Sequence, residues 1–139
     1  MSALKLLAED NDDLQVISAA LQDAVTRIGD ISYEPVPRRL TIAFNRFRWE
    51  KGKARERVRA ALQLGGVTGV KARKLRRDAA DAVLVLLALT FEPGEAPGGH
   101  VVLSFAGGGD LRVEVECIDA ALADVTAPWP TPRAPRHEV

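Results

Sequence analysis

The sequence has little of several residue types that would define a chemistry. Among its 139 residues there is one cysteine, Cys117, and there are two histidines, His100 and His137. A single cysteine excludes an internal disulfide framework, and these three residues are too few for a tetrahedral Cys/His zinc site. We therefore expect no disulfide, no metal site and a reducing, cytoplasmic setting.

Long apolar runs are also missing. The longest, residues 82–89, is too short to cross a bilayer, and the first residues lack the basic start and apolar core of a signal peptide. We expect no membrane contact. With 47% hydrophobic and 27% charged residues, the chain has the composition of one globular domain that can bury a core.

The net charge is zero, but the charges are unevenly distributed. Residues 1–37 carry two basic and seven acidic side chains, for a net charge of −5. Residues 38–77 carry fourteen basic and two acidic side chains, for a net charge of +12. Residues 78–139 carry three basic and ten acidic side chains, for a net charge of −7. Such segregation is typical of a chain with an anionic partner. It is equally typical of a chain whose acidic ends neutralise its basic middle after folding, and both alternatives stay open.

A long amphipathic helix is predicted over residues 12–28. Asn11 is a good N-cap, and the two aspartates that follow it lie where the helix dipole favours acidic side chains. Asp23 lies off the apolar stripe and is expected to be solvated, and Gly29 is a plausible helix stop. The stripe repeats at three- and four-residue steps and comprises Leu14, Ile17, Leu21, Val25 and Ile28.

After residue 30 the apolar period changes to two, which predicts strands joined mostly by short turns. The phase slips by one residue after Phe44, so a bulge or strand end is expected at Asn45–Arg46. Residues 83–91 are apolar on both faces, and their leucine and alanine content would allow a helix. The Thr-Phe-Glu-Pro ending and the turn that follows favour a central strand covered on both sides. Further strands are expected near residues 4–7 at a sheet edge, 31–35, 40–49, 55–64, 67–75 and in a hairpin over 101–117.

These elements predict an α+β fold. About seven mostly antiparallel strands form a curved sheet or partly closed barrel, with one long N-terminal amphipathic helix and a short C-terminal helical turn over residues 118–125. Residues 1–127 are expected to be a single domain. Residues 128–139 are rich in proline and are expected to form a flexible tail.

The strongest candidate site is basic. Residues 46–60 hold seven basic and two acidic side chains, and Arg55, Arg57 and Arg59 share one strand face. Their roots lie about 6.8 Å apart, which suits successive phosphates of an extended strand, and a neighbouring tryptophan suits base stacking. The opposing interpretation, which we favour, is that acidic neighbours neutralise this segment. The candidate polyanion face comprises Arg46, Arg48, Trp49, Lys51, Lys53, Arg55, Arg57 and Arg59.

No other pattern predicts catalysis, and we assign no catalytic residue and no cofactor. The phase of Cys117 places it on the buried face of its strand, where a thiol is inert. Glu114 and Glu116 alternate with Arg112 on what is expected to be a solvated strand face. The glycine run 107–109 is continued by a strand and lacks the lysine of a P-loop, so it predicts a hairpin turn.

Two segments resemble a known family: LQDAVTRIGDISYEPVPRRLTIAFNRFRWE and LSFAGGGDLRVEVECIDAALADV. They are similar to a family of small uncharacterised bacterial proteins, a domain of unknown function found mainly in alphaproteobacteria. NRFRWE and the AGGG–LRVEVECI hairpin carry the resemblance most specifically, and it covers residues 3–127. It implies a cytoplasmic, compact single domain and no site residues.

The sequence thus favours a small non-enzymatic binding or interaction module whose ligand it does not identify, with a protein partner or a second copy of the chain as open alternatives. The second hypothesis is weak, sequence-tolerant nucleic-acid binding through the basic strand face.

Overall fold

The computed structural model describes residues 3–49, 55–126 and 129–130, of which the last two are described by backbone pairing alone. This part of the chain forms one α-helix, one short 3-10 helix (η1), ten strands of three or more residues and one two-residue strand. The elements are β1 (Lys5–Ala8), α1 (Asn11–Ala20), β2 (Val25–Arg27), η1 (Ile28–Asp30), β3 (Ile31–Glu34), β4 (Arg39–Phe47), β5 (Glu56–Leu64), β6 (Val67–Arg73), β7 (Val83–Pro93), β8 (Gly99–Phe105), β9 (Asp110–Val115), β10 (Ala120–Asp124) and β11 (Trp129–Pro130).

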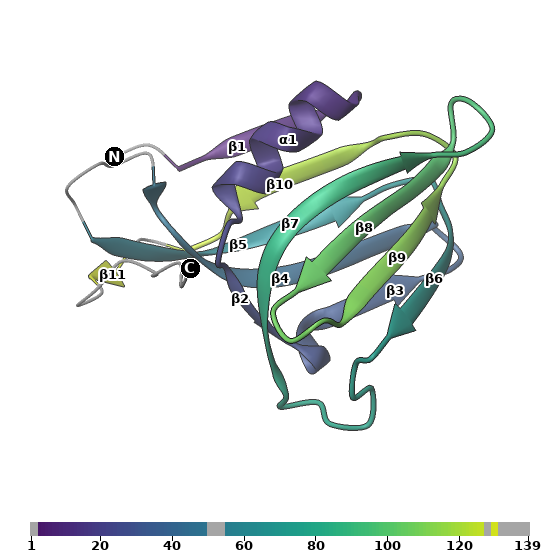
Figure 1. Ribbon diagram of the computed structural model, residues 1–139. Coiled ribbons are helices and arrows are strands. Elements are labelled where there is room, and N and C mark those ends of the chain that lie inside the picture. Colours follow the sequence, from purple (N-terminus) through teal and green to yellow (C-terminus); the bar gives the residue numbers. More distant parts are fainter. Residues whose placement is uncertain (1–2, 50–54, 127–128, 131–139) are drawn as a thin grey trace.

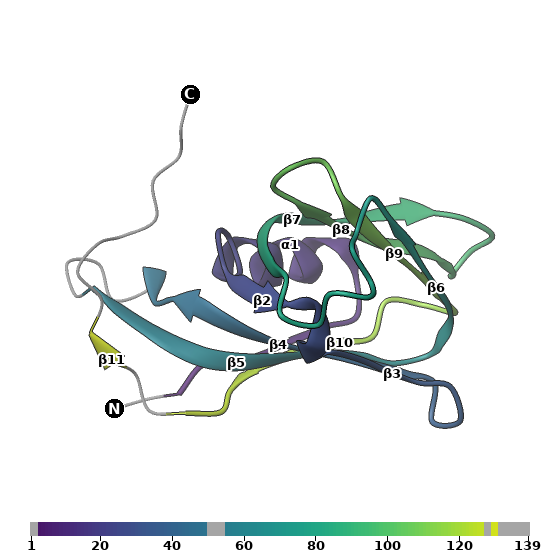
Figure 2. The same cartoon turned by 90° about the horizontal axis from the view of Figure 1, so that it is seen from below.

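The strands form one strongly curved antiparallel sheet in the order β1-β10-β5-β4-β2-β7-β8-β9-β6, with β3 beside β4 and β11 beside β5. The predicted antiparallel sheet with a helix is confirmed, although it has more strands than expected. The end strands β1 and β6 do not pair among the described residues, so the sheet is not a closed barrel. Strands β3, β4, β5 and β10 make one layer, and α1 lies with β7, β8 and β9 on the other (Figures 1 and 2).

Two neighbouring chain segments carry the sheet from one layer to the other. Strands β5 and β6 continue one another, as do β9 and β10, and the two segments pair on both sides of a bend: Leu64 with Ala120 and Val67 with Val115. At the bend Gly66 has φ +63°, a left-handed conformation that glycine adopts without strain. Successive strands β5 and β6 therefore do not form the hairpin that their sequence order suggests.

Within the segment 118–125, residues Ala120–Asp124 form strand β10, so the predicted helical turn is wrong. Its side chains alternate, with Ile118, Ala120 and Leu122 buried. β10 pairs with β1 on one side and β5 on the other. Backbone pairing along both edges outweighs the helix propensity of the alanines, which is weak by comparison. The predicted edge strand near residues 4–7 is confirmed as β1.

The helix α1 is shorter than predicted and ends at Ala20. Its cap is Asp10, not Asn11: the Asp10 carboxylate accepts a hydrogen bond from the Asp13 backbone N–H at 2.8 Å. Asp23 then takes a left-handed conformation (φ 60°) and turns the chain into β2, which pairs with β7. The β-branched residues that follow favour a strand, so the apolar stripe continues in the sequence beyond the end of the helix. Gly29, the predicted helix stop, lies in η1.

The side chains of α1 complete the edge of β7. Strand β7 pairs with β2 only over residues 83–85. Farther along, the Leu89 N–H donates to the Ser18 hydroxyl (2.9 Å) and the Leu89 carbonyl accepts from the Gln15 amide (3.3 Å). The helix therefore satisfies backbone groups that would otherwise lack partners in the core.

Strand β4 runs to Phe47 without the predicted bulge. It pairs with β5 in an unbroken register from Leu40–Leu64 to Phe47–Arg57. The apolar phase slips because the inward position after Phe44 is occupied by a charged residue, Arg46, which is 0% exposed. The pattern change marks a buried arginine, not a change of register.

The region 83–91 is strand β7, as predicted, but only one of its faces is well covered. Leu86 and Leu89 are buried, whereas Val83 and Leu87 are 61% and 49% exposed. The expectation that both faces are covered is wrong. The predicted hairpin is confirmed as β8 and β9, and Gly107 and Gly108 have positive φ in its turn.

We predict that Leu21→Ala lowers the free energy of unfolding by about 2–5 kcal/mol, as for other large-to-small changes in a core. Leu21 is 0% exposed and belongs to the main core. Chemical denaturation measures the loss. Val16→Ala in α1 is the control, because Val16 is 53% exposed and its replacement should cost little stability. Equal stabilities of the two variants would show that the helix is not docked as described.

Candidate functional site

The predicted basic face is divided by the fold, because two of its arginines are buried. Arg46 and Arg48 are 0% and 2% exposed. Arg46 donates two hydrogen bonds to the Asp124 carboxylate, from Nε at 2.8 Å and Nη2 at 2.9 Å. Arg48 Nη1 lies 2.7 Å from the Glu56 carboxylate. These two guanidinium groups are neutralised inside the chain and do not form a surface.

The Asp124 carboxylate joins three strands. Asp124 lies on β10 and accepts the two hydrogen bonds of Arg46, which lies on β4. Its Oδ2 also accepts a hydrogen bond of 2.9 Å from the backbone N–H of Leu4, the residue before β1. The side chains of the pair are 0% and 2% exposed. A buried pair with this bidentate geometry offsets much of its desolvation cost, but removing one partner leaves an uncompensated charge.

The outward arginines of β5 also have partners within the chain. Arg59 lies 3.4 Å from the Asp30 carboxylate and donates to the Asn45 side-chain oxygen at 3.0 Å. Arg57 donates to the Asn45 backbone carbonyl at 3.3 Å. Burial lowers the pKa of Arg57, and the charge of Asp23 opposes that shift. Asp23 is itself buried, which corrects the expectation that it is solvated.

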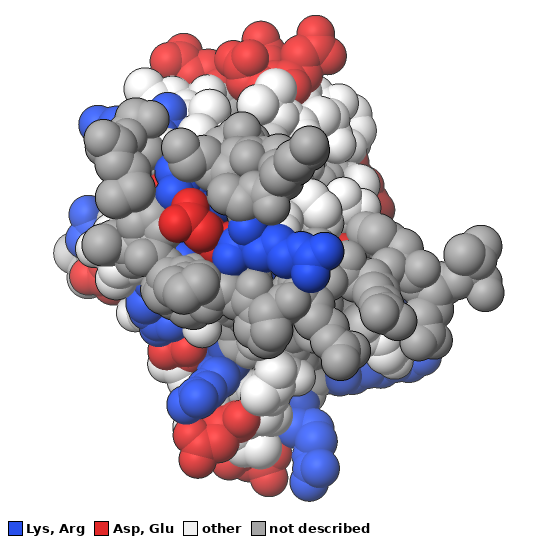
Figure 3. Space-filling model, turned by 90° about the vertical axis from the view of Figure 1, so that its left-hand side faces the viewer, with Lys and Arg blue, Asp and Glu red and all other residues white. Residues whose placement is uncertain are grey.

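The remaining residues of the predicted polyanion face differ in burial, and two of them are not described. Trp49 is half-buried, donates to the Gln22 carbonyl at 3.2 Å and meets Phe47 edge-on with ring centroids 4.6 Å apart. Arg55 is exposed, and Lys51 and Lys53 lie outside the described residues. On the described part of this side of the molecule, basic and acidic side chains are interspersed (Figure 3).

The remaining candidates lie apart from one another. Cys117 is exposed, because β9 ends at Val115 and the alternation that predicted burial stops there. Glu114 accepts from the Thr68 hydroxyl at 2.7 Å and lies 3.9 Å from His100. Glu116, beyond the strand, pairs with Arg38. Among the described residues, no group of three or more metal-ligating side chains occurs.

On the outer face of the β7–β9 sheet, Arg112 pairs with Glu92 at 2.5 Å, not with the adjacent glutamates. This hydrogen bond lowers the pKa of Glu92 and raises that of Arg112. Glu92 is exposed and Arg112 is half-buried at the surface, so this pair contributes little to folding.

An apolar cleft of about 350 Å³ lies between β3 and β6. β3 pairs with β4 and β6 pairs with β9, and the described residues provide no strand for the second edge of either. The core therefore reaches the surface between them, with Leu111 of β9, only 4% exposed, in the lining. The lining residues are Ile28, Ile31, Tyr33, Val70, Ala72, Leu75, Arg77 and Leu111.

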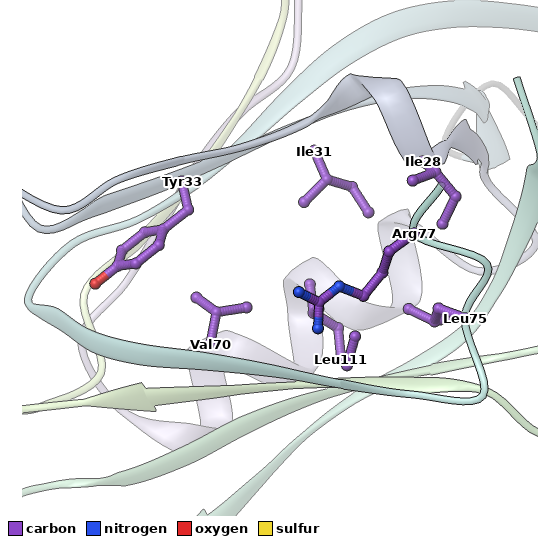
Figure 4. Close-up of a pocket in the computed structure, with 8 residues that line it drawn as sticks. Ile28, Ile31, Tyr33, Val70, Leu75, Arg77 and Leu111 are labelled. Atoms are coloured by element: carbon purple, nitrogen blue, oxygen red, sulfur yellow. The ribbon is translucent and has the colours of Figure 1, made fainter. Parts of the chain in front are cut away.

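One charged side chain enters this cleft. Arg77, from the connection between β6 and β7, extends between Ile31 and Leu111, and the ring of Tyr33 lines the opposite end (Figure 4). Within the described ranges, the Arg77 guanidinium makes no hydrogen bond or ion pair. An apolar wall with a single cation is suited to a small amphipathic molecule.

A second cavity, of about 370 Å³, lies beside the β7–β8 turn. Its lining includes Glu95, Glu114, Glu116 and His100 together with backbone of the glycine-rich turn. The carboxylates there are exposed, and two of them already bind Thr68 and Arg38. Glycines and charged side chains make up most of this lining, so it offers a small molecule less aliphatic contact than the β3–β6 cleft does.

Sequence patterns do not predict the β3–β6 cleft. Its lining comes from residues 28–33, residues 70–77 and Leu111, and only the fold brings these together. The alternation of Ile31 and Tyr33 correctly placed both on one strand face. Nothing local indicated that one edge of this strand would have no partner strand among the described residues.

These features define a small α+β protein with an open, curved antiparallel sheet and one apolar cleft. The family model described as "Protein of unknown function (DUF2948)" matches residues 4–137, and the chain belongs to this family. The resemblance to a family of unknown function is thereby confirmed, and the match extends past residue 127 into the proline-rich segment. Comparison with curated proteins and with solved structures gives no match.

No helix in the described part of the chain is long and apolar enough to span a membrane.

We predict that Asp124→Asn lowers the free energy of unfolding by about 3–5 kcal/mol, because it leaves the buried Arg46 charge uncompensated. Urea denaturation measures the loss. Glu34→Gln is the control, because it removes the ion pair between Arg39 and Glu34, whose side chains are 45% and 47% exposed. It should lower the free energy of unfolding by less than about 1 kcal/mol. Similar small losses in both variants would contradict the burial of the Arg46–Asp124 pair.

Proposed function

We propose that this protein is a small non-enzymatic binding module that takes up a small, largely apolar molecule in the cleft between β3 and β6. The observation that carries the proposal is the cleft itself: about 350 Å³, open to solvent and lined mostly by aliphatic side chains. Ligand sites are commonly concave, mainly apolar and about 300–1,000 Å³ in volume.

Much of the cleft wall belongs to strands that are paired in the sheet, which favours a preformed site. Ile31, Tyr33, Val70, Ala72 and Leu75 pack against the core while remaining partly exposed. A ligand lying on them removes apolar surface from water at about 0.8 kcal/mol per buried methylene group. Little of this energy is lost to ordering of the protein, since the two strands are already held by β4 and β9.

We propose a non-enzymatic role because the described residues of the cleft lining supply no nucleophile with an adjacent base. Its polar side chains are Tyr33 and Arg77, which bind and orient ligands but do not form a nucleophile–base pair. A cytoplasmic setting belongs to the same proposal and rests on the single, exposed Cys117.

We predict that n-octanol, a neutral apolar probe, binds in the cleft. In methyl NMR spectra the resonances of Ile28, Ile31 and Leu111 should shift. Those of Leu14 and Ile17, on the buried face of α1, should not shift. Ala72→Phe should weaken binding by filling the cleft with its ring. Lys71→Phe, which places the same ring on the other face of β6, is the matched control and should bind as wild type does.

Two outcomes would overturn the proposal. One is the absence of localised methyl shifts up to the solubility limit of n-octanol. The other is unchanged binding by an Ala72→Phe protein that is folded, because the probe would then lie elsewhere.

Nucleic-acid binding through the basic segment is the second candidate function. Arg46, Arg48 and Arg59 are held by Asp124, Glu56 and Asp30, which leaves fewer cations for a phosphate backbone. The exposed Arg55 is the observation that still favours it. Interspersed acidic side chains lower the local positive potential that sequence-tolerant binding requires.

We predict that the wild-type protein does not bind a labelled single-stranded oligonucleotide at low salt, as measured by fluorescence anisotropy. Replacing Arg55, Arg57 and Arg59 together by Gln should leave this result unchanged. It should lower stability, because the bonds of Arg59 to Asp30 and Asn45 are lost. Salt-dependent binding with a slope of about −0.7 per phosphate, abolished in the triple variant, would establish the nucleic-acid function instead.

A further inference from the structure

We propose that the β3–β6 cleft selects a small organic carboxylate, whose apolar body lies between the strands while the Arg77 guanidinium binds its carboxylate. This inference rests on the proposed function, because it names the chemical class of ligand that the same cleft takes. It predicts a preference for an anion over a neutral molecule with the same apolar chain.

The surroundings of Arg77 carry the proposal. Its guanidinium extends among Ile31, Val70 and Leu111, and none of the described residues that line the cleft is acidic (Figure 4). Elsewhere arginines are matched with acids, as in Arg38–Glu116, Arg39–Glu34, Arg73–Asp110 and Arg112–Glu92. Arg77 is exposed, so water solvates its charge while the cleft is open.

A ligand that fills the cleft changes this solvation. It removes water from the Arg77 guanidinium, and an unpaired cation among aliphatic side chains is costly. A neutral ligand leaves that cost in place. A carboxylate offsets it, because the guanidinium fork matches the two carboxylate oxygens in a bidentate, charge-assisted contact.

The charge count favours a monoanion. Among the described residues, Arg77 is the only cation in the lining of this cleft, which comes from η1, β3, β6, β9 and the β6–β7 connection. A dianionic phosphate would keep an unmatched charge against the same apolar walls. The ring of Tyr33 at the far end gives the apolar body of the ligand a flat surface to contact.

A competing interpretation is that Arg77 only covers apolar surface with its stem and keeps its head in water. The two interpretations differ in measurable ways. Under the competing one, an anion and a neutral molecule of equal chain length bind alike, and the charge of residue 77 is irrelevant to binding.

The test compares octanoate with n-octanol by the same methyl NMR titration, at about pH 8, well above the pKa of an alkyl carboxylic acid. Wild type should bind octanoate about tenfold more tightly or better, as expected for a hydrogen bond to a charged group. Arg77→Gln should lose that preference and still bind n-octanol. Arg76→Gln is the matched control, because Arg76 is an exposed neighbour outside the cleft lining and should behave as wild type does.

The outcomes separate this inference from the function on which it rests. If neither probe shifts the cleft methyl resonances, the cleft is not a binding site and both proposals fail. If the two probes bind equally, or if Arg77→Gln and Arg76→Gln retain the same preference for octanoate, the carboxylate inference fails and the binding module stands. Should Arg77→Gln unfold, Arg77→Lys keeps the charge without the fork and should bind octanoate more weakly than wild type.

Discussion

The bend shared by two chain segments is the constraint on which the rest of this structure depends. Strands β5–β6 and β9–β10 stay paired while they pass from one layer to the other, and the turn is made at Gly65–Gly66 opposite residues 116–119. The Gly65 N–H donates to the Asp119 carbonyl and the Glu116 N–H to the Gly66 carbonyl, so pairing continues through the bend. This geometry creates two apolar faces that enclose one core.

Folding the sheet over itself leaves one edge of β3, on one layer, and one edge of β6, on the other, without a partner strand among the described residues. Because the described strands do not close the gap between them, core side chains line a cleft there. On the opposite side the gap is filled differently: α1 lies between β1 and β7, and its Ser18 and Gln15 side chains take the place of a neighbouring strand. One opening is thus sealed by a helix, and the other remains accessible to a ligand.

Long-range ion pairs bring together the basic and acidic segments that balance in the zero net charge of the chain. The basic middle segment finds acids from both ends: Arg59 meets Asp30, and Arg46 meets Asp124. Burying a guanidinium in the sheet is costly unless its partner is fixed, and Asp124 is fixed by β10 and by its contact with the Leu4 N–H. Arg77, at the end of the same basic segment, is different because its surroundings are apolar.

The sequence by itself determined most strands of this protein, because alternation along a half-buried strand is a local pattern. Residues 56–64 and 101–115 show it clearly, and the hairpin glycines follow from turn geometry. Tertiary structure alone decided where α1 ends, that residues 120–124 pair as a strand, that Arg46 points inward and that β3 and β6 face an open cleft. Each of these depends on parts of the chain that are far away in sequence. The end of α1 depends on the pairing of β2 with β7, and the strand at residues 120–124 depends on β1 and β5. The inward position of Arg46 depends on Asp124, and the cleft depends on which strand edges find partners. Local periodicity carries no information about such partners, since the energy that selects them comes from pairing and desolvation across the whole fold.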